Sequence, residues 1–150
     1  MNEEQPSVPI AVNFHLYKPC NYRCRFCFAT YRDIEGQLAL PEARALLQLL
    51  REAGCKKLNF AGGEPTLHPR IGELVAEAKR LELVTTLITN GARLDRLLDE
   101  HAHEIDWVGL SVDSGDEDVQ AQLGRGRGGH VARSRAHVSR TASTDHPQLA

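Results

Sequence analysis

Residues 18–28 read Lys-Pro-Cys-Asn-Tyr-Arg-Cys-Arg-Phe-Cys-Phe, which places three cysteines in a CxxxCxxC arrangement, at Cys20, Cys24 and Cys27. The stretch directly follows residues 11–17, whose alternating polarity and aromatic and branched residues are typical of a β-strand. Three thiolates on one loop are one ligand short of the four that structural zinc sites usually have. An iron–sulfur cluster held by three cysteines keeps one iron free for another ligand. The spacing therefore favours a 4Fe–4S cluster with one open iron.

The same thiols leave two other interpretations open. One is a zinc site completed by His15 or Cys55, and the other is a set of partly buried thiols without a metal. Cys55 lies at the start of the second predicted strand, on the side of a parallel sheet away from the loop. We therefore expect Cys55 to be a structural thiol. His15 is near enough in the sequence to keep the zinc alternative open.

The composition is that of a soluble globular domain. The chain has 150 residues, of which 41% are hydrophobic and 25% charged, enough for one domain with a core. No apolar run approaches the roughly 20 residues that span a bilayer. Residues 1–9 are polar and do not resemble a signal peptide. We therefore expect a cytoplasmic protein, with no transmembrane segment, whose cysteines serve metal or redox chemistry rather than disulfides.

Strand and helix patterns alternate along the chain. Apolar residues at helical offsets follow each short β-branched or aromatic run. This order predicts an α/β fold with a parallel sheet and right-handed crossovers. We expect residues 1–10 to be a disordered lead-in and residues 11–123 to form the domain. The predicted strands are residues 11–17, 56–61, 83–89 and 107–112, and the predicted helices are residues 41–53, 69–81, 94–105 and, as a short one, 116–123.

Polar motifs follow the predicted strands. The cysteine loop follows the first strand, Gly62-Gly-Glu-Pro65 the second, Thr89-Asn-Gly91 the third, and Ser111-Val-Asp-Ser114 comes at the end of the fourth. The carboxyl ends of parallel strands meet at one edge of a sheet, where function gathers in such folds. The sequence therefore predicts that all four motifs form one site.

Two of these motifs together resemble the radical S-adenosylmethionine (SAM) superfamily. They are the CxxxCxxC loop, with Phe26 immediately before Cys27, and the Gly-Gly-Glu-Pro turn after the second strand. The resemblance implies a partial (β/α) TIM-type barrel, of which this chain has about four βα units of an expected six. It also implies that SAM occupies the open iron. The SAM-binding residues that it implies are Gly62, Gly63, Glu64, Pro65, Asn90, Ser111 and Arg125, and the cluster ligands are Cys20, Cys24 and Cys27.

Within that superfamily the chain resembles viperin and its prokaryotic relatives, which are antiviral nucleotide dehydratases. The likeness runs from about residue 11 to 129. It is carried by Asn13-Phe-His15, Cys20-Asn-Tyr-Arg-Cys24, Leu40-Pro41, Glu52-Ala-Gly54, Lys57-Leu-Asn-Phe60, Asp113-Ser114 and Leu123-Gly-Arg-Gly126.

This second resemblance implies a reaction. SAM is cleaved to a 5′-deoxyadenosyl radical, which abstracts the 4′ hydrogen of a ribonucleoside triphosphate. Loss of water from the ribose and a one-electron reduction then give a 3′-deoxy-3′,4′-didehydro chain terminator. An electron donor such as a flavodoxin or ferredoxin is implied, and DNA or RNA is not the substrate. The alternatives are a radical SAM enzyme acting on a peptide or other small molecule, and a non-catalytic zinc-binding module.

Asn13 and Lys57 match positions that face the nucleotide in that family. A lysine at the barrel mouth suits a triphosphate. Both residues are equally well interpreted as solvated polar residues of their strands. Ala61 stands where viperins commonly have Ser, which leaves the choice of nucleotide open.

The composition changes near residue 124. Residues 124–150 carry five arginines and one aspartate, whereas residues 1–123 carry a net charge of −6. The segment has no apolar helical face and no strand pattern, so we expect a disordered basic tail. One interpretation is a nucleic-acid-binding tail. The other, which we prefer, is a shifted reading frame or a truncated gene that leaves the barrel incomplete.

Overall fold

The computed structural model describes residues 9–29, 36–142 and 148–149. The predicted lead-in, residues 1–10, lies outside the described residues apart from Pro9 and Ile10, which are exposed. No helix within the described ranges is long and apolar enough to cross a membrane.

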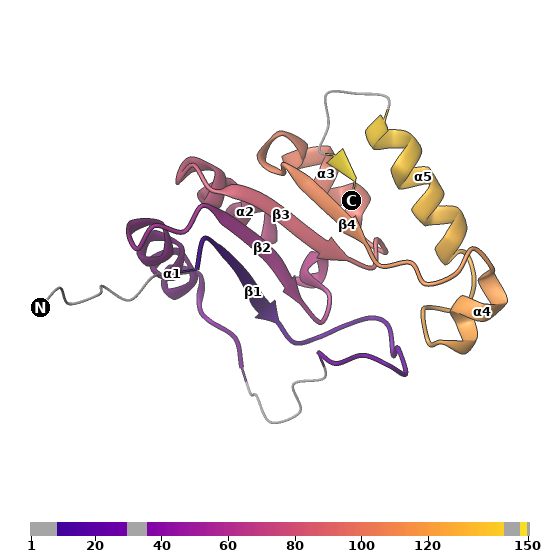
Figure 1. The fold of residues 1–150 in the computed structure, drawn as a ribbon. Coiled ribbons are helices and arrows are strands. Elements are labelled where there is room, and N and C mark those ends of the chain that lie inside the picture. The colour runs from indigo at the N-terminus through magenta and orange to yellow at the C-terminus, as the bar shows by residue number, and fades with distance from the viewer. Residues whose placement is uncertain (1–8, 30–35, 143–147, 150) are drawn as a thin grey trace, which may run out of the picture.

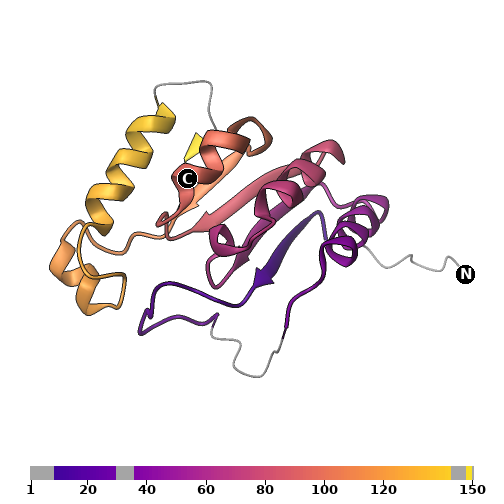
Figure 2. The same ribbon diagram turned by 180° about the vertical axis from the view of Figure 1, so that it is seen from behind.

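The described strands form one parallel sheet in the order β1-β2-β3-β4-β5 (Figure 1). Helices α1, α2 and α3 lie on the same face of this sheet (Figure 2). Each of them connects two neighbouring parallel strands, which confirms the predicted α/β alternation. The strands are β1 (Ala11–Tyr17), β2 (Lys57–Gly62), β3 (Val84–Thr89), β4 (Trp107–Leu110) and β5 (Gln148–Leu149); the α-helices are α1 (Leu40–Glu52), α2 (Ile71–Arg80), α3 (Leu94–His101), α4 (Glu117–Gln122) and α5 (His130–Ala142), with 3-10 turns η1 (Pro65–Leu67) and η2 (Ala102–Glu104).

The two faces of the sheet differ in polarity. The face under the helices carries Leu58, Phe60, Leu87 and Val108, all fully buried. Burial of one such side chain contributes about 1.5–3 kcal/mol, so this layer is the core of the domain. On the opposite face Asn13 aligns with Asn59, Asn59 with Thr86, and Thr86 with Trp107. This open face is therefore polar at its centre and leaves aromatic surface exposed.

Helix α1 shows how the local sequence sets an element's start. Pro41 occupies the first turn, where its missing N–H costs no hydrogen bond. The Glu42 carboxylate accepts the Ala39 N–H at 2.8 Å, which satisfies one amide before the helix. Ala43 and Leu47 then face the core. The predicted helix over residues 41–53 is thus confirmed, shifted by one residue.

The expectation of disorder after residue 123 is wrong for residues 130–142, which form α5 at the edge of the sheet beyond β4 (Figure 1). Its buried face is polar, with His130, Ser134, His137 and Thr141 at helical offsets. The His130 and His137 rings reach the carbonyls of Ser111 and Gly91. Hydrophobic periodicity depends on apolar residues, so a stripe of histidines and hydroxyls gives no such signal.

Ion pairs also hold α5 to the domain. Arg140 bonds Asp95 at 3.1 Å and Asp99 at 2.6 Å, both on α3. Such half-exposed pairs contribute little each, but together with the two buried histidines they fix the helix against α3 and its preceding loop. Residues 130–142 therefore pack on the domain and are not a separate tail.

Candidate functional site

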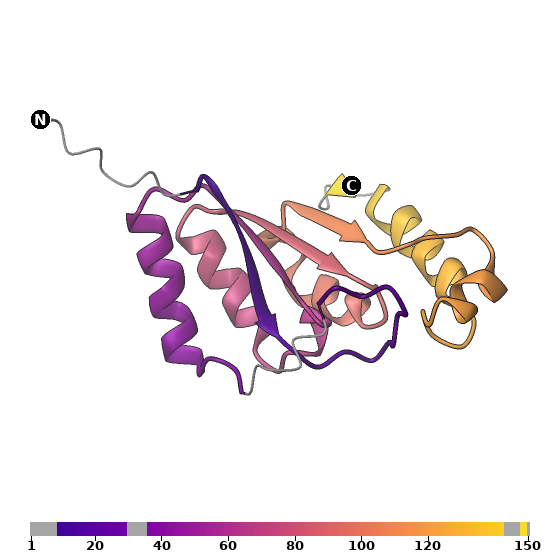
Figure 3. The ribbon, with the colours of Figure 1, turned by 60° about the horizontal axis from the view of Figure 1, so that its bottom comes forward.

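The cysteine loop lies at the carboxyl end of β1, beside the ends of β2 and β3 (Figure 3). The loop and these strand ends enclose a cavity of about 160 Å³. The predicted convergence of the four motifs is thus found in the structure. The cavity is lined by nine of the predicted site residues, Cys20, Cys24, Cys27, Gly62, Gly63, Glu64, Asn90, Ser111 and Arg125.

Short-range hydrogen bonds shape the cysteine loop. The Tyr22 N–H donates to Cys20 Sγ at 3.4 Å, and the Cys27 N–H donates to the Cys24 carbonyl at 3.2 Å. The Asn90 amide, at the end of β3, donates to Asn21 Oδ1 at 2.9 Å. The loop is therefore held both by its own turns and by the neighbouring strand end.

The surroundings of the loop both raise and lower the pKa values of its thiols. Partial desolvation by the surrounding chain raises the pKa of Cys20, which is still exposed, and of the half-buried Cys24, because a thiolate loses hydration there. For Cys24 the guanidinium of Arg125 acts in the opposite direction and lowers the pKa, whereas negative charge on Cys20 and Cys27 raises it. A cation bound among these thiols would favour their thiolate forms.

The two glycines of the Gly-Gly-Glu-Pro turn make room for the chain that enters the cysteine loop. A Cβ on Gly62 would lie 2.4 Å from the Tyr17 carbonyl oxygen, and one on Gly63 would lie 2.2 Å from that of Lys18. The Gly63 N–H donates to the Tyr17 carbonyl at 2.7 Å. The glycines were predicted to let the main chain approach a ligand, but in the structure the segment they approach is the start of the cysteine loop.

We expect Gly63→Ala to destabilise the protein by about 1–3 kcal/mol, because the added methyl group overlaps backbone atoms that cannot move independently of the loop. The measurement is urea unfolding followed by circular dichroism. Gly115→Ala is the matched control, since nothing lies within 4 Å of its Cβ position. Equal stability of the two variants would show that the loop does not pack against this turn.

Glu64 is buried and joins the end of β2 to the end of β3. Its Oε1 accepts hydrogen bonds from Thr66 and from the Thr89 hydroxyl, the latter at 2.6 Å. Its Oε2 accepts the Asn90 N–H at 2.8 Å. Oε1 thus accepts three hydrogen bonds and Oε2 one, so Oε2 retains capacity for another donor.

Arg125 supplies positive charge to the lining of the cavity. It is nine-tenths buried and forms an ion pair with Asp113. Its guanidinium also lies 5.4 Å from the ring centroid of Phe26, within the cysteine loop. Ser111 is held nearby, because its N–H donates to the Thr89 carbonyl at 2.9 Å.

Pro65, Asn13 and Lys57 do not line this cavity. Pro65 is buried at the start of η1. Asn13 and Lys57 line a second hollow of about 220 Å³ on the open face of the sheet. Ile88 borders both hollows, so the second one adjoins the cysteine cavity.

Sequence reasoning missed two polar residues of the second hollow. The Asn59 amide donates to Asn13 Oδ1 at 3.0 Å, and the Thr86 hydroxyl donates to Asn59 Oδ1 at 3.0 Å. Both follow from strand alternation, because Asn59 and Thr86 align with Asn13 in the sheet register. The alternation was available in the sequence, but the register was not.

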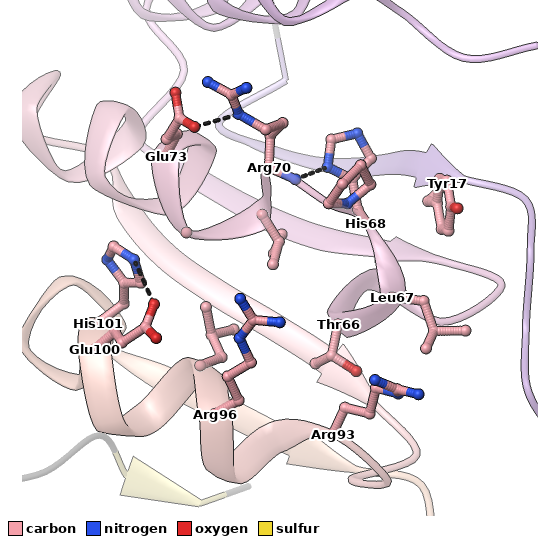
Figure 4. A pocket seen from close by; sticks show the side chains of 14 residues that line it. Tyr17, Thr66, Leu67, His68, Arg70, Glu73, Arg93, Arg96, Glu100 and His101 are labelled. Carbon is pink, nitrogen blue, oxygen red and sulfur yellow. Dashed lines mark hydrogen bonds and ion pairs between the residues drawn. The ribbon is translucent and has the colours of Figure 1, made fainter.

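A larger cavity, of about 530 Å³, lies on the helix side of the sheet between α2 and α3 (Figure 4). Arg70, Arg93, Arg96 and Glu100 line it. None of the three loop cysteines and none of the predicted site residues borders it. The predicted site residues instead gather around the smaller cavity.

Within the described parts of the chain, no three His, Cys, Asp or Glu side chains converge closely enough to hold a single metal ion. The three loop thiols line one cavity. His15 instead has its ring edge-on to Phe28, with 6.4 Å between centroids.

A family model described as the radical SAM superfamily matches residues 16–137, from the end of β1 into α5. The chain belongs to the radical SAM superfamily. This radical SAM chain is also similar to curated nucleotide dehydratases. It is 41% identical over 133 residues to the S-adenosylmethionine-dependent nucleotide dehydratase of Lacinutrix mariniflava, covering 84% of this chain and 28% of that protein.

Other dehydratases show similar likeness. The corresponding enzyme of Flammeovirga pacifica is 39% identical over 122 residues, covering 77% of this chain and 42% of that protein. S-adenosylmethionine-dependent nucleotide dehydratase RSAD2 of Oncorhynchus mykiss is 38% identical over 128 residues, covering 81% of this chain and 36% of that protein. The radical SAM chain thus spans less than half the length of these relatives. The predicted resemblance is confirmed.

Solved structures show the same fold. SuiB of Streptococcus suis superposes with a TM-score of 0.78 and 20% identity, covering 95% of this chain and 33% of that one. A structure of TYW1 with a lysine-pyruvate adduct bound gives a TM-score of 0.64 and 17% identity, covering 93% of this chain and 54% of that one. At these identities the likeness concerns the fold, and it confirms the predicted partial barrel.

Proposed function

We propose that this chain binds a 4Fe–4S cluster and SAM, and that it generates a radical to dehydrate a ribonucleoside triphosphate. The observation that carries the proposal is the single cavity shared by three loop thiols and the ends of β2 and β3. The runner-up is a radical SAM enzyme that acts on a peptide or another small molecule.

The donor set suits the cluster. Cys20, Cys24 and Cys27 offer three thiolates around one cavity, and His15 also borders it. Three cysteines of one loop suit a cluster that keeps one iron open, whereas structural zinc sites usually have four protein ligands, so the donor set favours the cluster. Once bound, such a cluster supplies the electron that cleaves SAM.

The surrounding residues suit the amino acid end of SAM. Glu64 Oε2, with capacity for one more donor, is placed to accept a hydrogen bond from the amino group. Arg125 offers positive charge to the carboxylate. Asn90 and Ser111 border the same space. The role of Asn90 extends to the loop itself, because its amide holds Asn21.

The adjoining hollow is the proposed nucleotide site. Lys57 is exposed at its edge, and its charge suits a phosphate. Asn13 lies in the same hollow, within the hydrogen-bonded row of Asn59 and Thr86. The product of the proposed reaction terminates RNA chains, which would place the protein in antiviral defence.

The test uses protein reconstituted anaerobically with iron and sulfide, then incubated with dithionite, SAM and each ribonucleoside triphosphate in turn. We expect one nucleotide to raise the release of 5′-deoxyadenosine roughly tenfold, because substrate in place lowers the barrier by about 1.4 kcal/mol. A reaction without dithionite is the control. SAM cleavage that no nucleotide stimulates would favour the runner-up.

A further inference from the structure

The segment that precedes α5 lies against the cysteine loop. The Arg23 N–H donates to the Gly124 carbonyl at 3.1 Å, and the Arg25 N–H donates to the Leu123 carbonyl at 3.0 Å. In Figure 3 the loop and the turn after α4 lie side by side at one end of the sheet. Main-chain pairing therefore joins two stretches that are far apart in the sequence.

Gly124 permits this pairing. Its φ of +86° lies in the left-handed region, and a Cβ there would lie 2.2 Å from the Arg23 carbonyl oxygen. Both constraints favour glycine. The contact is thus built into the backbone and does not depend on flexible side chains.

Tyr22 joins the loop to α5 through a continuous row of hydrogen bonds. Arg133 Nη1 donates to the Tyr22 hydroxyl at 3.1 Å, and that hydroxyl lies 3.4 Å from His130 Nδ1. His130 Nε2 lies 3.0 Å from the Ser111 carbonyl. A carbonyl only accepts, so Nε2 carries the ring proton, Nδ1 accepts, and the Tyr22 hydroxyl donates to it.

The environment of His130 agrees with that assignment. The residue is fully buried, and its ring stands edge-on to that of Tyr22 with 5.5 Å between centroids. Burial lowers the pKa of His130, which favours the neutral ring that this arrangement needs. Glu117 fixes the start of the helix, since its carboxylate accepts the N–H groups of His130 and Ala132 at 2.9 and 3.0 Å.

We propose that Tyr22, His130 and Arg133 are positioning residues, which brace the cysteine loop against α5 so that its thiols face the cavity. Tyr22 also contacts one of these thiols directly, because its N–H donates to Cys20 Sγ. The inference rests on the proposed function only in naming the cluster as what the thiols hold. The hydrogen bonds of the brace join protein groups only, so they are also tested in the metal-free protein.

The first test is amide hydrogen exchange on the metal-free protein. In Arg133→Met, we expect the Arg23 and Arg25 amides to exchange about fivefold faster, as for loss of one hydrogen bond of ordinary net strength. In Tyr22→Phe we expect at least the same acceleration, because that change also removes the bond to His130. Amides of β2 are expected to keep their wild-type rates. Arg135→Met is the matched control, because Arg135 is exposed on the same helix and has no hydrogen-bond or ion-pair partner within the described ranges.

Two further readouts separate a brace from general loss of stability. The double variant is expected to exchange no faster than Tyr22→Phe, since that change already removes the hydrogen bond to Arg133 together with the one to His130. In reconstituted protein, a chelator is expected to remove iron several-fold faster from both single variants than from Arg135→Met.

Wild-type exchange rates at Arg23 and Arg25 in both single variants would overturn the brace. So would equal acceleration at β2, which would indicate global destabilisation. A wild-type protein that takes up no iron would contradict the proposed function, while the exchange experiment would still decide on the brace.

Discussion

Cys24→Ala is expected to abolish iron binding by the reconstituted protein. Cys24 is one of three thiols around the cavity, and no fourth cysteine lies there to replace it. A cluster that keeps only two protein ligands is not retained through desalting, so we expect iron content to fall at least about tenfold. Iron and sulfide analysis and the visible charge-transfer absorption measure the effect.

Cys55→Ala is the matched control for that experiment. Cys55 is fully buried, and its thiol bonds the carbonyls of Ile10 and Lys57 at the far end of the sheet. We expect this variant to bind as much iron as the wild type, with a stability loss of about 1 kcal/mol. Equal iron in Cys24→Ala and in the wild type would exclude the loop as the ligand source. A colourless wild type holding one zinc per chain would support the zinc module instead.

Glu64→Gln is expected to lower the free energy of unfolding by about 1–3 kcal/mol. The Glu64 carboxylate accepts donors on both oxygens, from Thr66, Thr89 and Asn90. The glutamine NH₂ group would face a buried donor in either orientation, which leaves that donor unsatisfied. Urea unfolding of the metal-free protein measures the loss independently of cofactors.

Glu82→Gln serves as the control for Glu64. Its side chain is 82% exposed and pairs with Arg51 at 3.2 Å, so the change is expected to cost less than about 1 kcal/mol. If both variants were equally stable, the buried carboxylate would not be joining the two strand ends.

Hydrophobic periodicity predicted the strands and helices that build the core. The first strand was predicted at residues 11–17, where β1 runs from Ala11 to Tyr17. The first helix was predicted one residue late, since Leu40 precedes Pro41 in the first turn. These elements bury aliphatic side chains at regular spacing, which is the signal that a single sequence carries best.

Helix α5 carried no such signal. His130 and His137 are buried because each finds a backbone carbonyl at the end of a neighbouring strand or in the turn beyond it. Those partners come from tertiary structure, so residue type alone suggested an exposed tail. A buried polar face becomes favourable only once its hydrogen bonds are known.

The sequence predicts which site residues lie together better than it predicts what each of them contacts. Parallel strand ends meet at one edge, which is why Cys20, Gly62 and Asn90 were expected together and are found together. The sequence did not reveal that the glycines face residues 17–19. It also did not reveal the brace on Tyr22, because Arg133 lies far along the chain.

The most direct test of the central claim is iron analysis and electron paramagnetic resonance of the reconstituted, dithionite-reduced wild-type protein, before and after SAM is added. Three thiols that leave one iron open predict about four irons and four sulfides per chain, and a signal that SAM alters. A protein without iron, or with a cluster signal that SAM leaves unchanged, would contradict the claim.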